Sequence, residues 1–370
     1  MWRIPVPFGQ VRLSLQILFE AVTILCLAGF VYQRVNKWWG LFLGLTLVSL
    51  FIPFYTKESF LSYYAIVIAT LWYALIVLTV DKDGCQHLMD AICVIALFHV
   101  FFQIMQIVGC DPMFVDKDGL RNKAPLGLMS NLNETAALLA FCAPAFLRRG
   151  YRKGLIVIVA GLVMAKVTMG LLAALAGAMF YLCVVSRKVW LLAYIPAGAV
   201  VAVAYFVWVD MPGVERWKVW QTAYGMFKEH WLFGSGIGHW KMVVNFPIHG
   251  VRWKTAHCEY IQGLFEMGIF FPVIMFGYFA DVIRRAWGHT RNLIIPLTAL
   301  VVIAANCTAN FCMHIAPTAM IAVTWLAILQ VELNLKDRQD DETILYRARP
   351  KRKSSRLRQN RKSSSNRSRR

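Results

Sequence analysis

Three short groups of residues between positions 210 and 268 carry side chains that could do chemistry together. In chain order they are Arg216–Trp220, the turn Gly234–Gly238, and the stretch Ala256–Gly268, which contains His257. A guanidinium group suits two hydrogen bonds to one phosphate, and a neutral imidazole can accept a proton from a hydroxyl near neutral pH. This combination favours a substrate that brings a phosphate and a hydroxyl to the same place.

His257 is the strongest candidate for a catalytic group, because it stands where a polar loop enters a helical stretch. Position alone equally allows a histidine that is hydrogen-bonded at a membrane interface. Glu266 lies farther along, inside an apolar run, where an ionisable group is costly and usually faces a polar cavity or a partner. Glu266 could orient a histidine or an arginine, or it could complete a buried polar cluster.

The glycines of the central turn are a weak signal when taken alone. They do not form the G-x-G-x-x-G pattern that follows a strand in dinucleotide-binding units, so the turn does not predict nucleotide binding. Glycine at positions 234, 236 and 238 suits a backbone that bends sharply or lets a bulky ligand approach closely. An ordinary flexible turn is the alternative.

The elements that must position these groups are hydrophobic helices. Only 16% of the 370 residues are charged and 58% are hydrophobic, whereas a soluble domain carries about a quarter charged residues. Because a helix needs roughly 20 apolar residues to cross a bilayer, the sequence predicts an all-α polytopic membrane protein with about ten to twelve transmembrane helices. The predicted spans cover residues 14–33, 38–54, 60–80, 88–109, 132–147, 154–168, 169–186, 189–209, 260–280, 293–312 and 315–331. A tight turn or a broken helix is expected around Thr168–Gly170, where two spans almost touch.

The nine cysteines are scattered, and most fall inside apolar runs. They include no C-x-x-C pair and no spacing typical of metal ligands, so we interpret them as small buried hydrophobic residues and expect no metal. The one pair that could meet is Cys110 with Cys258, because the predicted topology places both on the same side of the membrane.

A basic C-terminal tail fixes the predicted orientation. Residues 336–370 contain 14 Lys or Arg against 4 Asp or Glu, a net charge of +10 out of +19 for the whole chain. A run of this composition predicts disorder, and the positive-inside rule places it in the cytoplasm. We therefore expect a transmembrane domain over residues 1–333 and a disordered basic tail over residues 334–370. A solvated topology anchor is favoured over nucleic-acid binding.

The predicted topology puts one large loop, about residues 210–257, on the outer side of the membrane. This loop carries six basic residues against three acidic ones, on the side that normally avoids Lys and Arg. Long loops can escape the positive-inside rule, so the excess of basic residues need not reflect a function. The sharper hypothesis is an anionic substrate that binds there.

The order of motifs resembles the O-antigen ligase and polymerase superfamily of bacterial membrane glycosyltransferases. Three blocks carry the resemblance: Arg-x-x-x-Trp at Arg216, Gly-x-Gly-x-Gly at Gly234, and Ala-His-x-x-Tyr-x-Gln-x-x-x-Glu-x-Gly from Ala256. The segment Gly127–Pro144, in which Asn131, Asn133 and Glu134 open a helix, is similar to the upstream element of that family.

The resemblance implies a glycosyltransferase of the bacterial inner membrane, working at the outer face without a cofactor or metal. Its donor would be a glycan on undecaprenyl pyrophosphate, and its acceptor a hydroxyl of a glycan, lipid or protein. By the same resemblance His257 matches the catalytic histidine and Arg216 the arginine that binds pyrophosphate. Further substrate-binding residues would be Tyr260, Glu266, Arg252, Lys254 and the glycines Gly234, Gly236 and Gly238.

Two positions depart from the family pattern. Cys258 follows the histidine where Asn or Ser is usual, and Met169 stands where the family carries the arginine of a Ser-Arg-Gly element. Arg252, Lys254 or Lys166 could take the place of that second arginine.

Two other classes of function remain open from the sequence. A transporter or flippase of an anionic lipid or solute would also need basic groups, although it should show repeated halves or paired half-helices. A non-enzymatic membrane anchor would explain the tail but not the loop motifs.

Overall fold

The computed structural model describes residues 36–50, 57–110, 124–187, 212–240 and 255–348. Within these ranges the chain contains helices and no strand, which confirms the predicted helical class. The predicted spans at 14–33 and 189–209 lie outside the described residues. The chain divides into two compact units, Met1–Glu332 and Leu333–Arg370.

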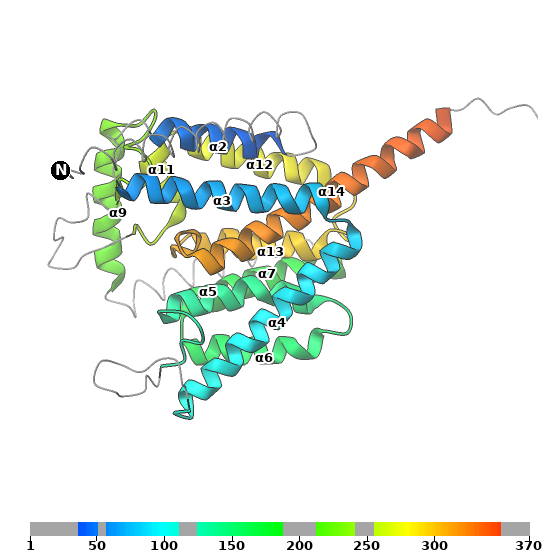
Figure 1. Cartoon of the computed structure of the whole chain (residues 1–370), viewed down its shortest axis with the longest axis horizontal. Helices are drawn as coiled ribbons and strands as arrows, with labels where there is room; N and C mark the ends of the chain where they lie inside the picture. The colour runs from blue at the N-terminus through cyan, green and yellow to red at the C-terminus, as the bar shows by residue number, and fades with distance from the viewer. Residues whose placement is uncertain (1–35, 51–56, 111–123, 188–211, 241–254, 349–370) are drawn as a thin grey trace, which may run out of the picture. The chain divides into compact units, whose positions relative to one another are not determined.

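Most of the described helices follow the predicted spans (Figure 1). In chain order they are α2 (Lys37–Leu50), α3 (Lys57–Thr79), α4 (Lys82–Ile107), α5 (Leu132–Cys142) with the short 3-10 helix η1 (Ala143–Leu147), α6 (Arg152–Ala165), α7 (Thr168–Ser186), α9 (Pro212–Glu229), α11 (Glu259–Met267), α12 (Phe270–Ala286), α13 (Ile294–Cys307), the 3-10 helix η3 (Cys312–His314) and α14 (Ala316–Ala348).

Four of these helices contain a segment long and apolar enough to cross a bilayer, as a helical membrane protein requires. The segments are Leu61–Thr79, Lys82–Ile107, Thr168–Ser186 and Ala316–Asp340. Many large apolar side chains point outward from them, such as Leu78 of α3 and Phe98 of α4, each more than half exposed. Outward-facing leucine and phenylalanine suit contact with lipid.

Small residues let helix α7 pack closely on two neighbours, α5 and α13. A Cβ atom built on Gly170 would lie 2.6 Å from Cβ of Ala136 in α5, and one on Gly177 would lie 2.3 Å from Cγ2 of Val302 in α13. Approach at these distances is possible only without a side chain, and such sites are common between membrane helices. The positions of α5, α7 and α13 relative to one another are therefore determined by close packing at these small residues.

Helix α14 joins this group to the helices at the other side of the same unit. The Trp325 indole N–H donates to the Phe141 carbonyl of α5 at 2.8 Å. One residue earlier, the Thr324 hydroxyl accepts a hydrogen bond from the Trp72 indole of α3 at 2.9 Å. Helices α2 and α3 pack together, and α2 also packs on α12.

The span predicted at 260–280 is wrong as a single helix, because it divides into α11 and α12 at Gly268. Gly268 has φ +66°, a left-handed conformation that glycine adopts without strain, and a Cβ atom there would lie 2.3 Å from the Leu232 carbonyl oxygen. An approaching backbone segment thus replaces the side chain. The hydrophobic pattern continues through the break, so periodicity alone did not reveal it.

The end of α14 and the turn near Thr168 also differ from expectation. Helix α14 continues to Ala348, into the segment expected to be disordered, and residues 349–370 lie outside the described residues. Charged pairs such as Lys336 with Asp340, four residues apart and 3.9 Å between Nζ and Oδ2, favour a helix there. The turn expected near Thr168 lies slightly earlier, at left-handed Lys166 and extended Val167.

Candidate functional site

His257 lies two residues before helix α11, next to the N-cap residue Cys258, on a backbone with φ +52°. Few residues with a side chain adopt this left-handed conformation, although histidine does so more often than most. The imidazole is half-buried, and its ring meets the ring of Phe311 edge to face, with 4.8 Å between centroids. The residue predicted to be catalytic therefore has a defined conformation and a defined neighbour.

The peptide groups of Ala256, the residue before His257, are held from two directions. The Ala256 N–H donates to Oε1 of Gln262 at 3.1 Å, and the Ala256 carbonyl accepts from the Trp220 indole N–H at 2.8 Å. Ala256 has no exposed surface, so water cannot replace either partner. Helices α9 and α11 thus fix the approach to His257 together.

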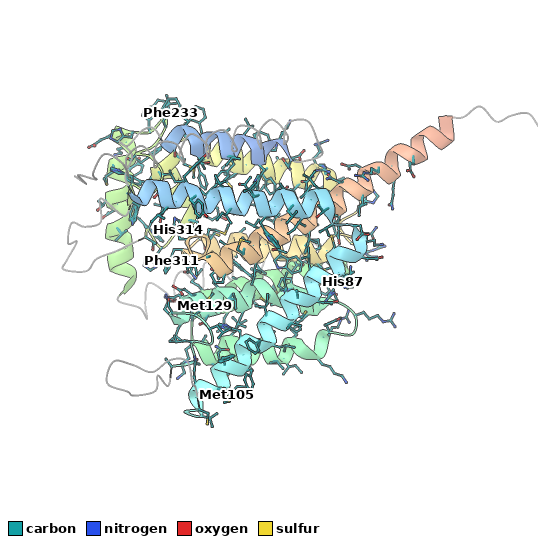
Figure 2. All side chains as sticks on the ribbon, in the orientation of Figure 1. His87, Met105, Met129, Phe233, Phe311 and His314 are labelled. Atoms are coloured by element: carbon teal, nitrogen blue, oxygen red, sulfur yellow. The ribbon has the colours of Figure 1, made fainter. Side chains whose placement is uncertain are left out.

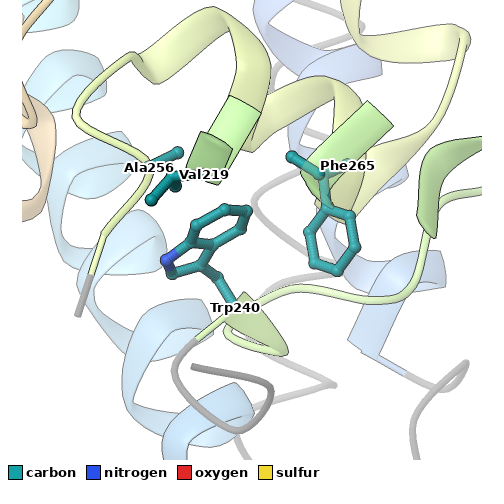
Figure 3. Packing of buried hydrophobic residues seen from close by; sticks show 5 residues of the cluster. Val219, Trp240, Ala256 and Phe265 are labelled. Atoms are coloured by element: carbon teal, nitrogen blue, oxygen red, sulfur yellow. The ribbon is translucent and has the colours of Figure 1, made fainter. Parts of the chain in front are cut away.

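A hydrophobic cluster joins α9 to α11 and to the glycine turn (Figure 3). The Trp240 indole lies between Ala256 and Phe265, and its ring meets the Phe265 ring edge to face at 5.4 Å between centroids. Val219 and Ala223 of α9 complete the cluster. Two of the three groups singled out in the sequence therefore share one core, together with Trp240, which follows the glycine turn by two residues.

The predicted cationic residues are described only in part. Arg216 belongs to α9, one helical turn before Trp220, and its side chain lies outside the described part of the structure. Arg252 and Lys254 lie in the range 241–254, which is also outside it.

The glycine turn is bound to the C-terminal end of α11. The Ser235 and Gly236 N–H groups donate to the carbonyls of Phe265 and Glu266, each at 2.9 Å. A Cβ atom on Gly234, where φ is +75°, would lie 2.4 Å from the Glu266 carbonyl carbon. Close backbone packing explains why this position is a glycine.

Glu266 fills the space that the turn encloses. Its carboxylate accepts hydrogen bonds from the backbone N–H groups of Gly238 and Trp240 and from the Gln262 amide, which lies 3.2 Å away. The side chain is only 4% exposed, so it completes a buried polar cluster, the second of the two roles considered for it. These backbone donors are occupied by the protein's own carboxylate, so a phosphate would have to find its donors elsewhere.

A polar chain runs along one face of α11 and reaches the connection between α13 and α14. Gln262 Nε2 lies 2.9 Å from Nε2 of His314, and His314 Nδ1 lies 3.0 Å from a Glu259 carboxylate oxygen. Glu259 also accepts a hydrogen bond from the Met313 N–H at 2.7 Å. Figure 2 labels His314 and Phe311 on this connection. A second histidine therefore lies within the same hydrogen-bonded cluster as the Ala256 peptide.

The upstream element Gly127–Pro144 meets the same connection. The Asn310 amide Nδ2 donates to the Asn133 carbonyl at 3.4 Å, one residue before Phe311. Asn131 caps α5 by accepting from the Glu134 N–H at 3.0 Å, and it donates back to the Glu134 carboxylate at 2.6 Å. This reciprocal cap fixes the start of α5 and explains Asn131 and Glu134 by local structure.

Tyr260 and Met169 have contacts that bear on their predicted roles. The Tyr260 hydroxyl donates to the Ala304 carbonyl of α13 at 2.9 Å, so it ties α11 to α13. Met169 lies half-buried in the first turn of α7, beside Gly170, which is packed against α5. The exposed Lys166 lies two residues before α7, with Val167 between them.

The described cysteines are free thiols. Cys110 is exposed and Cys258 is buried, so the pair considered from the sequence is not a disulfide. The two cysteines in contact are Cys307 and Cys312, both buried, with 3.5 Å between sulfur atoms. Among the described residues, no three His, Cys, Asp or Glu side chains gather closely enough to hold a metal ion.

His239 ends the glycine turn, and burial lowers its pKa below the usual 6.5, with a further contribution from nearby His230. Its Nδ1 atom is buried without a hydrogen-bond partner. A proton on this ring would add a poorly solvated charge to the turn.

His314 and Phe311 were not predicted from the sequence. They are 52 and 54 residues from Gln262 and His257 along the chain, and only the fold brings them together. The one sequence signal for His314 was modest: a histidine in the two-residue interval between the predicted spans 293–312 and 315–331. Phe311 lies inside the first of these spans and had no signal of its own.

Comparisons with protein-family models, with curated proteins and with solved structures gave no match to this chain. The geometry of the site therefore has to carry the functional argument.

Proposed function

We propose that this protein is a membrane glycosyltransferase of the O-antigen ligase or polymerase type. It would move a glycan from a polyprenyl-pyrophosphate donor to an acceptor hydroxyl, with His257 and Arg216 as its central groups. The observation that carries the proposal is the pair of hydrogen bonds on Ala256. They link the helix that bears Arg216 to the backbone that presents His257.

The reaction needs two tasks: removal of a proton from the acceptor and stabilisation of the anionic leaving group. The acceptor oxygen attacks the anomeric carbon of the donor, and the bond from that carbon to the pyrophosphate oxygen breaks. His257 takes the proton from the acceptor hydroxyl. Arg216 stabilises the negative charge that develops on the departing lipid pyrophosphate. Arg252 and Lys254 would supply further positive charge on the same loop, in the place of the arginine that Met169 replaces.

The proposal also includes a membrane topology that goes beyond the four candidate spans described above. The chain would cross a bacterial inner membrane about ten to twelve times, with the loop 210–257 outside and the C-terminus in the cytoplasm. Its partners would be the lipid-linked glycan, an acceptor glycan, lipid or protein, and the bilayer, without nucleic acid.

Glycan transfer by purified protein in detergent tests the chemistry. We expect wild-type protein to transfer glycan from a lipid pyrophosphate donor, and His257→Ala and Arg216→Ala to lose at least about a hundredfold of this rate. The matched controls are His87→Ala on α4 and Arg149→Ala between η1 and α6, both of which change exposed side chains. Equal losses in the controls would show that the effect is not specific to His257 and Arg216. No transfer by folded wild type would favour a transporter.

Labelling of native Cys110 tests the orientation. This thiol is exposed at the end of the α4 region and belongs to the predicted outer side. A maleimide that cannot cross membranes should label it in intact cells, and Cys110→Ser should abolish that label. Labelling only after the cells are opened would contradict the proposed topology.

A further inference from the structure

We propose that Gln262 is a positioning residue for His257. It acts through the Ala256 peptide, and His314 and Glu266 fix the orientation of its amide. The inference rests on the proposed function, because it gives His257 a role in glycan transfer. It adds a mechanism by which a buried side chain controls that role without touching the substrate.

The first step is the bond from the Ala256 N–H to Gln262 Oε1, at 3.1 Å. Both residues are buried, with Ala256 at 0% and Gln262 at 2% exposure. A buried N–H that loses its acceptor has no water to turn to, so the peptide must move or remain unpaired. Gln262 therefore restrains the Thr255–Ala256 peptide, the second peptide group before His257. The next peptide group, Ala256–His257, is held by Trp220 through the Ala256 carbonyl.

The second step concerns the two possible orientations of the Gln262 amide. In the observed orientation Oε1 accepts from Ala256, while Nε2 faces Glu266 Oε1 at 3.2 Å and His314 Nε2 at 2.9 Å. A flipped amide would place its oxygen against the Glu266 carboxylate and its NH₂ against the Ala256 N–H. Acceptor would meet acceptor and donor would meet donor, so the surroundings allow one orientation.

The third step extends this constraint to His314. Because Gln262 Nε2 is a donor, the facing His314 Nε2 must accept, and the ring proton must lie on Nδ1. Nδ1 lies 3.0 Å from a Glu259 carboxylate oxygen, which accepts a hydrogen bond from the Nδ1–H. Glu259 thus selects the histidine tautomer that holds Gln262 in place, as a carboxylate does for a histidine elsewhere.

The last step is the backbone of His257 itself. A residue with a side chain stays at φ +52° only when its surroundings hold it there. On the N-terminal side, Ala256 is held at its N–H by Gln262 and at its carbonyl by Trp220. If the Gln262 bond is lost, Ala256 can shift, and we expect the imidazole to leave its edge-to-face contact with Phe311.

The test combines kinetics with hydrogen exchange on the full-length protein in detergent. For Gln262→Leu we expect kcat to fall about tenfold, as loss of one buried hydrogen bond allows, while KM for the lipid donor stays within about twofold because no substrate contact is lost. The amide of Ala256 should exchange faster than in wild type. Gln262→Glu should recover part of the rate, because a protonated carboxyl can accept from Ala256 and donate to Glu266. Gln330→Leu on α14 is the matched control for removing a buried glutamine.

Several outcomes separate this inference from the proposed function. A wild-type kcat or unchanged Ala256 exchange in Gln262→Leu would overturn it while leaving the glycosyltransferase proposal intact. If wild type transfers no glycan, the proposed function fails, and faster Ala256 exchange would still establish the restraint on the peptide. If Gln262→Leu does not fold, His314→Phe interrupts the same chain one bond farther away. It should lower kcat about threefold and speed Ala256 exchange, and no change in either would overturn the inference.

Discussion

Trp220 and Trp325 make the same bond in two different parts of the molecule. Each donates its indole N–H to a backbone carbonyl at 2.8 Å, Trp220 to Ala256 and Trp325 to Phe141. Trp325 is 1% exposed and joins α14 to α5, where close-packed small residues already fix the neighbouring helices by shape. Trp220 is half-buried and joins α9 to the loop that presents His257.

The comparison separates two uses of one interaction. Between α5, α7 and α13, the position of each helix follows from packing, so the indole bond adds stability to an arrangement already determined. Around α11, side-chain hydrogen bonds to backbone hold the described loop residues in place. Changes in the first region should lower stability, and changes in the second should lower activity in protein that remains folded.

The largest effect is expected from Gly177→Leu, in the region fixed by shape. A side chain there would collide with Val302 of α13, and overpacking of this kind costs about 3 kcal/mol. Yield and thermal unfolding in detergent would measure the loss. Gly40→Leu on α2 is the control, since a Cβ atom at Gly40 meets nothing within 4 Å. Equal stability of the two variants would contradict the close contact of α7 with α13.

Trp325→Phe should have the next largest effect on stability. It removes the donor to the Phe141 carbonyl and leaves space beside α5, together about 2 kcal/mol of unfolding free energy. The rate of glycan transfer per folded molecule should stay within about twofold of wild type, because this region does not touch His257. A loss of rate larger than the loss of stability would mean that the two regions are coupled.

Trp220→Phe should reverse this pattern. The variant keeps an aromatic ring in the cluster but loses the bond to the Ala256 carbonyl. We expect kcat to fall about fivefold, corresponding to a hydrogen bond worth about 1 kcal/mol, with little change in yield. Transfer at the wild-type rate would show that the indole bond serves only stability, as it does in Trp325.

The smallest effect is expected from the pH dependence of His239. Burial lowers its pKa in the folded protein, so the unfolded chain binds this proton more readily. Folding stability should therefore decrease as pH falls below the ordinary value of about 6.5, and His239→Phe should reduce this decrease. Thermal unfolding of both proteins between about pH 5 and 7.5 would measure it. An identical slope in the two would show that other groups govern the acid response.

The sequence allowed much of the fold to be predicted, because hydrophobic runs mark helices directly. Residues 60–80 and 169–186, for example, correspond closely to α3 and α7. The break at Gly268 was missed because apolar residues continue on both sides, and the close approach of Leu232 that requires glycine is a tertiary contact. Motif order pointed to His257 and its segment. It could not reveal His314, whose relation to Gln262 exists only in three dimensions.

The nine residues of α11 set the spacing of the three groups that they bind. Glu259, Gln262 and Glu266 stand about 4.5 and 6 Å apart along the helix axis. They bind, in that order, the α13–α14 connection, the Ala256 peptide and the glycine turn. A substitution removes one of these contacts, whereas deleting one residue would rotate every later side chain of the helix by about 100° about its axis. A deletion within α11 should therefore be tolerated less well than a substitution of any one of its side chains.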